Sequence, residues 1–321
     1  MAEARDLNSS DLLTTPPTFM GAPYSTDAAG AGAAILGCPF DCGTHPFRIG
    51  SRQGPASIRE QSRLIRRFQS DGIDEDIVTK LGVIDAGDVR LTPSRIEDAF
   101  ERIEEAAYRL ASAGAAPIGL GGDGSVSLPL IRGCSRVHQN LAVLHIDSHT
   151  DAYPVNEDHP YDAATQFTHA ALEQRVRPAL SHHVGLRGTT FRGGVYDYGR
   201  QLGYNLIPMK EFAQRGPDDV LAQLRGSIGQ APVYLSWDMD VFDPSCAPGV
   251  CTPAWGGFSA REGLGFLRAM SGLNIVAADV NTVSPPHDIN GMTAFLAAAV
   301  VHEIILLINS ARLDAGRGAA P

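Results

Sequence analysis

The stretch Leu141–Asp151, LAVLHIDSHTD, runs from an apolar segment directly into alternating histidines and aspartates. Its apolar part has no alternation of apolar and polar residues, which is typical of a strand buried on both faces. We therefore predict a strand over Leu141–Ile146. Six other segments have the same character and are also expected to be strands: Ala33–Gly37, Leu81–Ile84, Pro117–Leu120, His183–Leu186, Val233–Ser236 and Ile275–Val280.

Helical patterns lie between these strands. The sequence Ser94–Glu97, SRIE, predicts a capping box that opens a helix ending near Ala113, and Ser259–Glu262, SARE, predicts a second one. Strands alternating with helices indicate an α/β fold with three α/β/α layers and a mostly parallel, doubly wound sheet. In such sheets ligands bind at the carboxyl ends of the strands.

The 321 residues are expected to form one domain over 31–312, with an extended N-terminal arm at 1–30 and a flexible tail at 313–321. A single domain is expected because the motifs between Gly121 and Thr282 should converge on one site. The arm is predicted from its Ser, Thr, Pro, Gly and Ala content.

The charge balance argues against several classes of partner. Lys and Arg number 26 against 36 Asp and Glu, a formal charge of −10, which disfavours nucleic acids and anionic membranes. The apolar stretch Ala294–Ile308 is interrupted by His302 and Glu303, and we expect it to be too short to cross a bilayer. Five cysteines without C-x-x-C spacing indicate reduced thiols and a cytoplasmic protein.

Three strands end in acidic or glycine-rich motifs: Gly121–Ser125, GGDGS; Asp147–Asp151, DSHTD; and Asp238–Asp243, DMDVFD. Each motif alone is more typical of a turn or a solvated loop. Together, at successive strand ends, they crowd carboxylates that need cations to offset their repulsion. Oxygen ligands with an occasional imidazole favour Mn²⁺ or Ni²⁺.

The chain resembles the ureohydrolase family, which includes arginase and agmatinase. The resemblance is carried by Gly37–Asp41, GCPFD, by Gly54–Arg59, GPASIR, and by the third motif with its continuation through Ala247–Gly249 and Gly256–Phe258. It implies an arginase-like α/β/α domain assembled as a trimer or hexamer. It also implies a binuclear Mn²⁺ site that hydrolyses a guanidino compound to urea and an amine.

The resemblance assigns ligands position by position. Asp147 and Asp238 would bridge two metals, and His149 and Asp240 would complete one of the two sites. Every protein ligand of that site is present. We therefore expect at most one Mn²⁺ or Ni²⁺ site.

The other site and its surroundings depart from the family pattern at three positions. That site would use Asp151 and a histidine, but the histidine position is Gly124. Ala163 stands where the family has a histidine that transfers protons. Thr282 stands where the family has a glutamate that binds the guanidinium group, so no catalytic residue is assigned.

Two functions follow, together with a weaker third. We favour a non-catalytic or regulatory subunit that joins a homologous active ureohydrolase in a hetero-oligomer, an arrangement resembling heteromeric hydrolases of the metformin type. The alternative is an active agmatinase-like hydrolase with a rebuilt site, in which Glu157, Asp158, His159 or His287 replaces the missing groups. The third is a ligand-binding or structural module without an enzyme partner.

Overall fold

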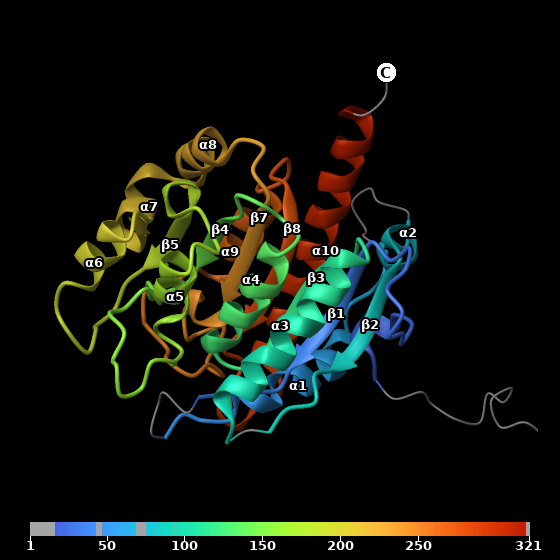
Figure 1. Ribbon diagram of the computed structural model, residues 1–321, viewed down its shortest axis with the longest axis horizontal. Coiled ribbons are helices and arrows are strands. Elements are labelled where there is room, and N and C mark those ends of the chain that lie inside the picture. Colours follow the sequence, from blue (N-terminus) through green and yellow to red (C-terminus); the bar gives the residue numbers. More distant parts are fainter. Residues whose placement is uncertain (1–16, 43–46, 69–74, 93, 319–321) are drawn as a thin grey trace, which may run out of the picture.

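The computed structural model describes residues 17–42, 47–68, 75–92 and 94–318, with side chains to 314. Its centre is a parallel eight-stranded sheet in the order β2-β1-β3-β8-β7-β4-β5-β6 (Figure 1). The strands are β1 (Ala33–Cys38), β2 (Val83–Asp88), β3 (Ala116–Gly121), β4 (Ala142–Ile146), β5 (His182–Leu186), β6 (Asn205–Pro208), β7 (Val233–Asp238) and β8 (Ile275–Asn281). The predicted α/β fold with a parallel sheet is confirmed.

Most of the expected strands are present, with two differences. Leu81 ends the short helix α2 (Ile77–Leu81), and Gly82 follows with a left-handed φ of 68°, so β2 begins only at Val83. The edge strand β6 was not expected. Its four residues, NLIP, include only two buried side chains, too few to form an apolar run.

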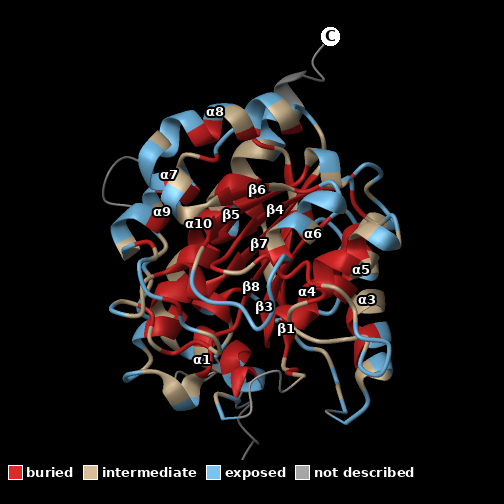
Figure 2. Cartoon of the chain, turned by 90° about the vertical axis from the view of Figure 1, so that its left-hand side faces the viewer, coloured by how far each residue is buried: buried red, intermediate tan, exposed pale blue. Residues whose placement is uncertain are grey.

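Helices cover both faces of the sheet. One face packs against α1 (Gly54–Ser62), α2, α7 (Met209–Arg215), α8 (Pro217–Ile228), α9 (Ala260–Arg268) and α10 (Met292–Gly318). The other packs against α3 (Ile96–Ser112), α4 (Ser127–Ser135), α5 (Gln166–Leu172) and α6 (Val195–Gln201). Neighbouring strand residues such as Ile35 and Leu36 point into opposite apolar clusters. The strands are therefore buried on both sides, as Figure 2 shows in red.

The two predicted capping boxes have different outcomes. At α9 the Ser259 hydroxyl accepts the Glu262 backbone N–H while the Glu262 carboxylate accepts the Ser259 N–H, so this capping box is confirmed. The capping box at Ser94 is wrong. Helix α3 begins at Ile96, and Arg95, the residue before it, makes no side-chain cap. The C-terminal end of this helix was predicted well: the helix ends at Ser112, one residue before the expected Ala113.

The apolar C-terminal stretch is longer than the sequence prediction allowed. Met292–Asp314 is a helical span of 23 residues with mean hydropathy 1.9, long and apolar enough to cross a membrane by these measures alone. The length argument against a membrane span was therefore wrong. However, 72% of its most apolar window is buried inside the molecule, against α1, α9 and β8, so the fold itself accounts for its apolar character. The helix continues through Gly318, into the segment predicted to be a tail.

Part of the segment predicted as an arm packs into the molecule, while residues 1–16 lie outside the described residues. Phe19 is fully buried, and its N–H donates to Asp85 Oδ2 at 2.8 Å. Asp85 also receives two bonds from the buried Arg59 of the GPASIR motif, at 2.8 and 2.9 Å. The motif thus holds α1, the strand β2 and this segment together.

Candidate metal centre

The acidic motifs meet at the carboxyl edge of the sheet, beside one cavity of about 290 Å³. Strands β3, β8, β7 and β4 are consecutive neighbours, so their carboxyl ends lie side by side. The residues at these ends and in the loops that follow share the cavity wall: Asp123, His149, Asp151, Asp238, Asp240 and Thr282. Residues from the three motifs and Thr282 thus line one cavity, as the sequence predicted.

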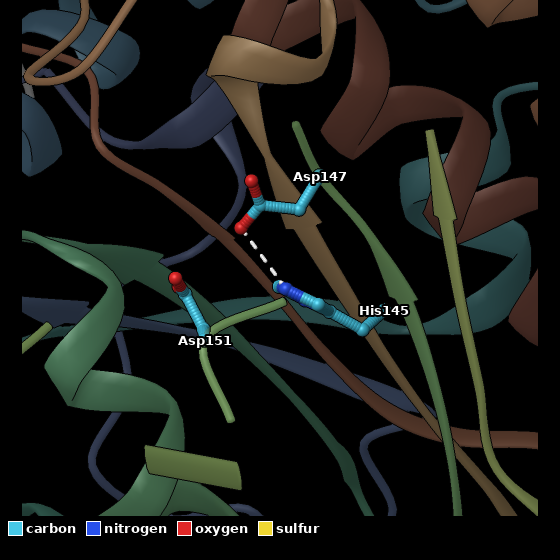
Figure 3. Close-up of side chains that lie close together, drawn as sticks. All are labelled: His145, Asp147 and Asp151. Carbon is cyan, nitrogen blue, oxygen red and sulfur yellow. Dashed lines mark ion pairs between the residues drawn. The ribbon is translucent and has the colours of Figure 1, made fainter. Parts of the chain in front are cut away.

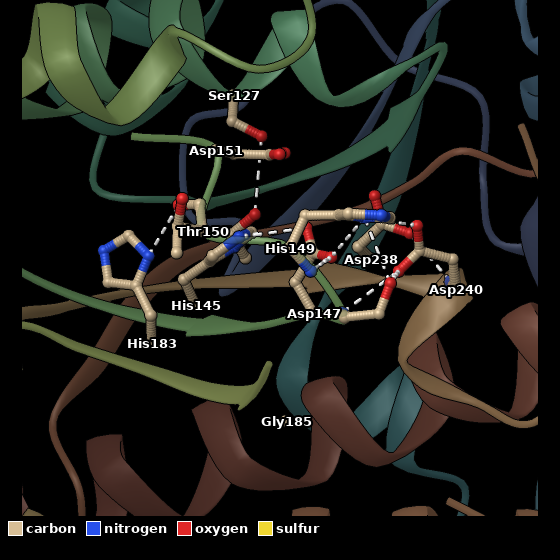
Figure 4. A network of polar contacts seen from close by, with 12 residues as sticks. Ser127, His145, Asp147, His149, Thr150, Asp151, His183, Gly185, Asp238 and Asp240 are labelled. Atoms are coloured by element: carbon tan, nitrogen blue, oxygen red, sulfur yellow. Dashed lines mark hydrogen bonds and ion pairs between the residues drawn. The ribbon is translucent and has the colours of Figure 1, made fainter. Parts of the chain in front are cut away.

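One group of possible ligands consists of Asp147, His149 and Asp240, whose donor atoms all lie within 4.8 Å of one another (Figure 4). His149 Nδ1 is 3.0 Å from Asp240 Oδ2 and 3.4 Å from Asp147 Oδ1. Backbone N–H groups fix the carboxylates: His149 donates to Asp147 at 2.6 Å, and Asp240 donates to Asp238 at 2.7 Å. Each motif therefore orients its own aspartates through a tight local turn.

The buried charges of this group strongly perturb one another. Burial raises the pKa of Asp238 well above its usual value, and the nearby Asp240 and Asp147 carboxylates raise it further. Burial would also raise the pKa of Asp147, but the imidazoles of His145 and His149 outweigh it and hold that pKa well below the usual range. The two shifts are opposite because Asp238 lies among carboxylates, whereas Asp147 lies between two imidazoles.

His145, which the sequence reasoning did not single out, forms a second group with Asp147 and Asp151 (Figure 3). Its Nε2 lies 2.9 Å from Asp147 Oδ2, and both atoms are buried without a well-aligned hydrogen bond. Asp147 thus turns one oxygen to each group. The period of two along β4 could have revealed His145, because residues 145 and 147 of a strand face the same side.

At Gly124 the missing family histidine leaves a space that another residue fills. A Cβ atom added to Gly124 would lie 2.7 Å from Gln166 Nε2 and 3.1 Å from Asp151 Oδ2. The Gln166 amide is buried, and its Nε2 donates to Asp151 Oδ2 at 2.5 Å. Sequence reasoning had no signal for this contact, because Gln166 comes from α5, across the cavity edge from the glycine-rich turn.

The other two departures also lie at the cavity. Ala163 lines it and offers no ionisable side chain. Thr282 is buried, and its hydroxyl donates to Asp238 Oδ1 at 2.5 Å, so it contacts a predicted ligand directly. Thr282 has a left-handed φ of 66°, which a β-branched residue rarely adopts.

The four residues proposed to replace the missing groups do not reach the site. Glu157, Asp158 and His159 are exposed, and none of them lines the cavity; neither does His287. That expectation of the rebuilt site is wrong, because none of the four side chains lines the cavity that holds the acidic motifs. Asp243 also lies apart: its carboxylate caps its own loop, accepting the Ser245 and Gly256 backbone N–H groups.

Some cavity residues were missed by the sequence reasoning. Arg48 lies at the wall, where its guanidinium donates to the Pro248 and Val250 carbonyl oxygens. Tyr153 and Phe191 also line the cavity. None belongs to an acidic motif, so only the folded chain brings them to the strand ends.

Comparison with known proteins shows the family to which this chain belongs. The model of the arginase family matches residues 31–307. This chain is a member of the arginase family. This chain is 36% identical to guanidinopropionase from Pseudomonas aeruginosa over 298 residues, which cover 91% of each of the two chains. It is 34% identical to an agmatinase from Photorhabdus laumondii, covering 94% of this chain and 93% of that one.

The solved structure of proclavaminate amidinohydrolase from Streptomyces clavuligerus superimposes on this arginase-family chain with a TM-score of 0.88. The two are 35% identical, and the match covers 93% of this chain and 98% of the other. An arginase from Bacillus caldovelox, 23% identical with a TM-score of 0.73, has the same fold. The predicted ureohydrolase family is therefore confirmed.

One of the two cation positions of the family pattern has all its ligands in this chain, and the other lacks one. Asp147, His149 and Asp240, with Asp238 beside them, supply buried carboxylates and an imidazole, the donor set that suits a divalent ion such as Mn²⁺. At the other family position Gly124 supplies no ligand, and an amide N–H faces Asp151. A binuclear site built as in the family pattern does not fit this chain.

Proposed function

We propose that this arginase-family chain is a non-catalytic or regulatory subunit that assembles with an active homologous ureohydrolase, as a trimer or hexamer. The active partner would hydrolyse a guanidino or biguanide compound to urea and an amine. The observation that carries the proposal is the composition of the cavity wall. Among the described residues, His149 is the only histidine that lines it, and it belongs to the cation group.

Three separate functions of a ureohydrolase site are therefore without their usual groups. Gly124 removes a ligand, Ala163 removes an acid–base group and Thr282 removes a carboxylate that would pair with a guanidinium. Loss of a general acid–base group alone typically lowers a rate by about 10²–10⁴-fold. The intact scaffold with an altered site supports a role in assembly rather than in turnover.

The surface near the cavity mouth supports a protein partner. Phe191 lines the cavity and is 86% exposed, and Trp255 is 76% exposed. Arg187 links the two segments that carry them, donating to the Trp255 and Ala254 carbonyl oxygens at 3.2 and 2.8 Å. Aromatic residues are enriched in protein interfaces, so we assign these two side chains to the contact with a partner subunit. We place the assembly in the cytoplasm, in keeping with five free cysteines.

A second candidate, an active metal-dependent hydrolase of a guanidino C–N bond, has three observations in its favour. The chain is 36% identical to guanidinopropionase, His145, Asp147 and Asp151 form a second group of possible metal ligands, and the cavity keeps a further acidic side chain. That side chain is Asp123, whose pKa burial raises to about 6. Above that pH this group carries a negative charge that a guanidinium substrate could approach. Its oxygens already accept hydrogen bonds from the Cys42 and Ser125 backbone N–H groups, which leaves it less available than a free glutamate.

The test is urea release from agmatine, guanidinopropionate and a biguanide by three samples: this chain alone, an intact homologue from the same genome alone, and both after co-expression. Each is loaded separately with Mn²⁺ and Ni²⁺. We expect no turnover by this chain alone, co-purification of the two chains at a fixed ratio, and urea release by the mixed assembly. Urea release by this chain alone at ordinary enzymatic rates would refute the proposal and favour the second candidate.

A further inference from the structure

Asp151 is held by a neutral donor that comes from a different part of the fold. Asp151 is buried, and its φ of 47° turns it back toward the sheet edge after β4. Gln166, at the start of α5, places its amide Nε2 2.5 Å from Asp151 Oδ2. An amide N–H carries a partial positive charge, and the oxygen of the Asp151 carboxyl group accepts it.

The amide fits there because residue 124 is glycine. The nearest neighbours of a Cβ at Gly124 would be Gln166 Nε2 at 2.7 Å, Asp151 Oδ2 at 3.1 Å and the Ala163 carbonyl oxygen at 3.3 Å. A larger residue at 124 would therefore have to displace the amide first. Gly124 and Gln166 form a complementary pair: one lacks a side chain and the other fills the space.

We propose that Gln166 takes the place of a second cation, closing the position beside Asp151 so that each chain binds one divalent ion, at the Asp147–His149–Asp240 group. Thr282 acts in the same direction, because its hydroxyl bonds to Asp238. Two carboxylates near the missing ligand are thus satisfied by neutral donors of the chain itself. The inference concerns the number of cations, so it stands or falls separately from the proposed function.

The competing arrangement is a second cation on His145, Asp147 and Asp151. A carboxylate can bind a cation through one oxygen while the other accepts a hydrogen bond, so what opposes a cation there is the amide itself, whose Nε2 fills the space beside Gly124 and bonds Asp151 Oδ2. Gln166 Oε1 is buried without a hydrogen-bond partner, so a turned amide would present that oxygen instead and lose the Nε2 bond. The observed bond to Asp151 favours closure.

The test counts bound metal per full-length chain, by native mass spectrometry and elemental analysis, after saturation with Mn²⁺ or Ni²⁺ and removal of excess ion. Four proteins are compared: wild type, Gln166→Ala, Gly124→His, and the double variant Gly124→His/Gln166→Ala. The double variant exchanges the volume of the amide for an imidazole next to Asp151. We expect one ion in the wild type and in Gly124→His, where the amide remains, and two ions in Gln166→Ala and in the double variant, where the amide is removed.

Three results would overturn the proposal. Two ions in the wild type would show that Gln166 does not close the position, and loss of one of them in Gln166→Ala would make the amide a ligand. Two ions in Gly124→His alone would show that the amide yields without hindrance. One ion in Gln166→Ala or in the double variant, where these keep the wild-type circular dichroism, would show that the pair does not control the site. The wild-type count decides the matter even if the double variant fails to fold.

Discussion

The contact between Thr282 and Asp238 gives a direct test of how the altered site is stabilised. We expect Thr282→Val to lower the free energy of unfolding in the absence of metal. Valine has nearly the same shape as threonine, so the change leaves no large cavity and removes chiefly the hydroxyl that donates to Asp238 Oδ1. Both atoms are buried, so water does not readily replace the lost donor.

The expected magnitude follows from the kind of hydrogen bond. A neutral hydrogen bond contributes about 1 kcal/mol and one to a charged group about 1.5–3 kcal/mol, so we expect a loss of about 1–3 kcal/mol. The left-handed φ of 66° at Thr282 adds backbone strain. That strain is common to threonine and valine because both are β-branched, and it cancels in the comparison.

The assay is urea denaturation with a metal chelator at pH 8 and fixed protein concentration, followed by circular dichroism. Thr282→Ser is the matched control: it keeps the hydroxyl and loses one buried methyl group, so it should cost no more than about 0.8 kcal/mol. The reasoning is refuted if Thr282→Val is as stable as the wild type, or if Thr282→Ser loses as much as Thr282→Val. Either result would mean that the hydroxyl does not stabilise Asp238.

Three further changes test the fold by the same denaturation assay. Arg59→Lys removes the two-bond contact with buried Asp85 and should cost about 2–4 kcal/mol; a cost below 1 kcal/mol would contradict the buried pair. Ser259→Ala removes an observed cap and should cost about 1 kcal/mol, whereas Ser94→Ala removes none and should cost nothing measurable; equal losses would count against the cap assignment. Glu173→Gln should cost about 1–2 kcal/mol at pH 7, where the carboxylate accepts two bonds from its arginine partner. Burial would raise the pKa of Glu173, but the arginine outweighs it and holds the pKa below the usual 4.5. The stabilisation by the Glu173 carboxylate is therefore full above about pH 5 and is lost as pH falls through the folded-state pKa. A stability difference between wild type and Glu173→Gln that grows on acidification would contradict this.

The local parts of the fold were well predicted, because buried strands have a distinct sequence pattern. The predicted strand Val233–Ser236, for example, begins at the observed residue and is two residues shorter than the observed strand, which ends at Asp238. Strand β6 escaped prediction because four residues at a sheet edge bury too little to form a pattern. The cap at Ser94 failed because the residue pattern of a capping box does not guarantee that the helix begins next to it.

The candidate site likewise has features that the sequence predicted and features that it could not predict. Asp147 and His149 could be assigned from their motif, since both follow one strand and the local turn fixes their carboxylate and imidazole. The substitutions at Gly124 and Thr282 were also visible in the sequence. What they meant was not, because a missing side chain can leave a void, admit a new ligand or admit a neutral donor.

The sequence by itself determined the parallel sheet, the edge at which the acidic motifs gather, and the positions where the family pattern is broken. These are properties of short segments, set by hydrophobic pattern and local turns. Tertiary structure alone decided that Gln166 occupies the space at Gly124, that Thr282 bonds to Asp238, and that Glu157 and His159 lie outside the cavity lining. Such contacts join segments distant along the chain, and they depend on how α5, β7 and β8 pack together, which no local pattern specifies.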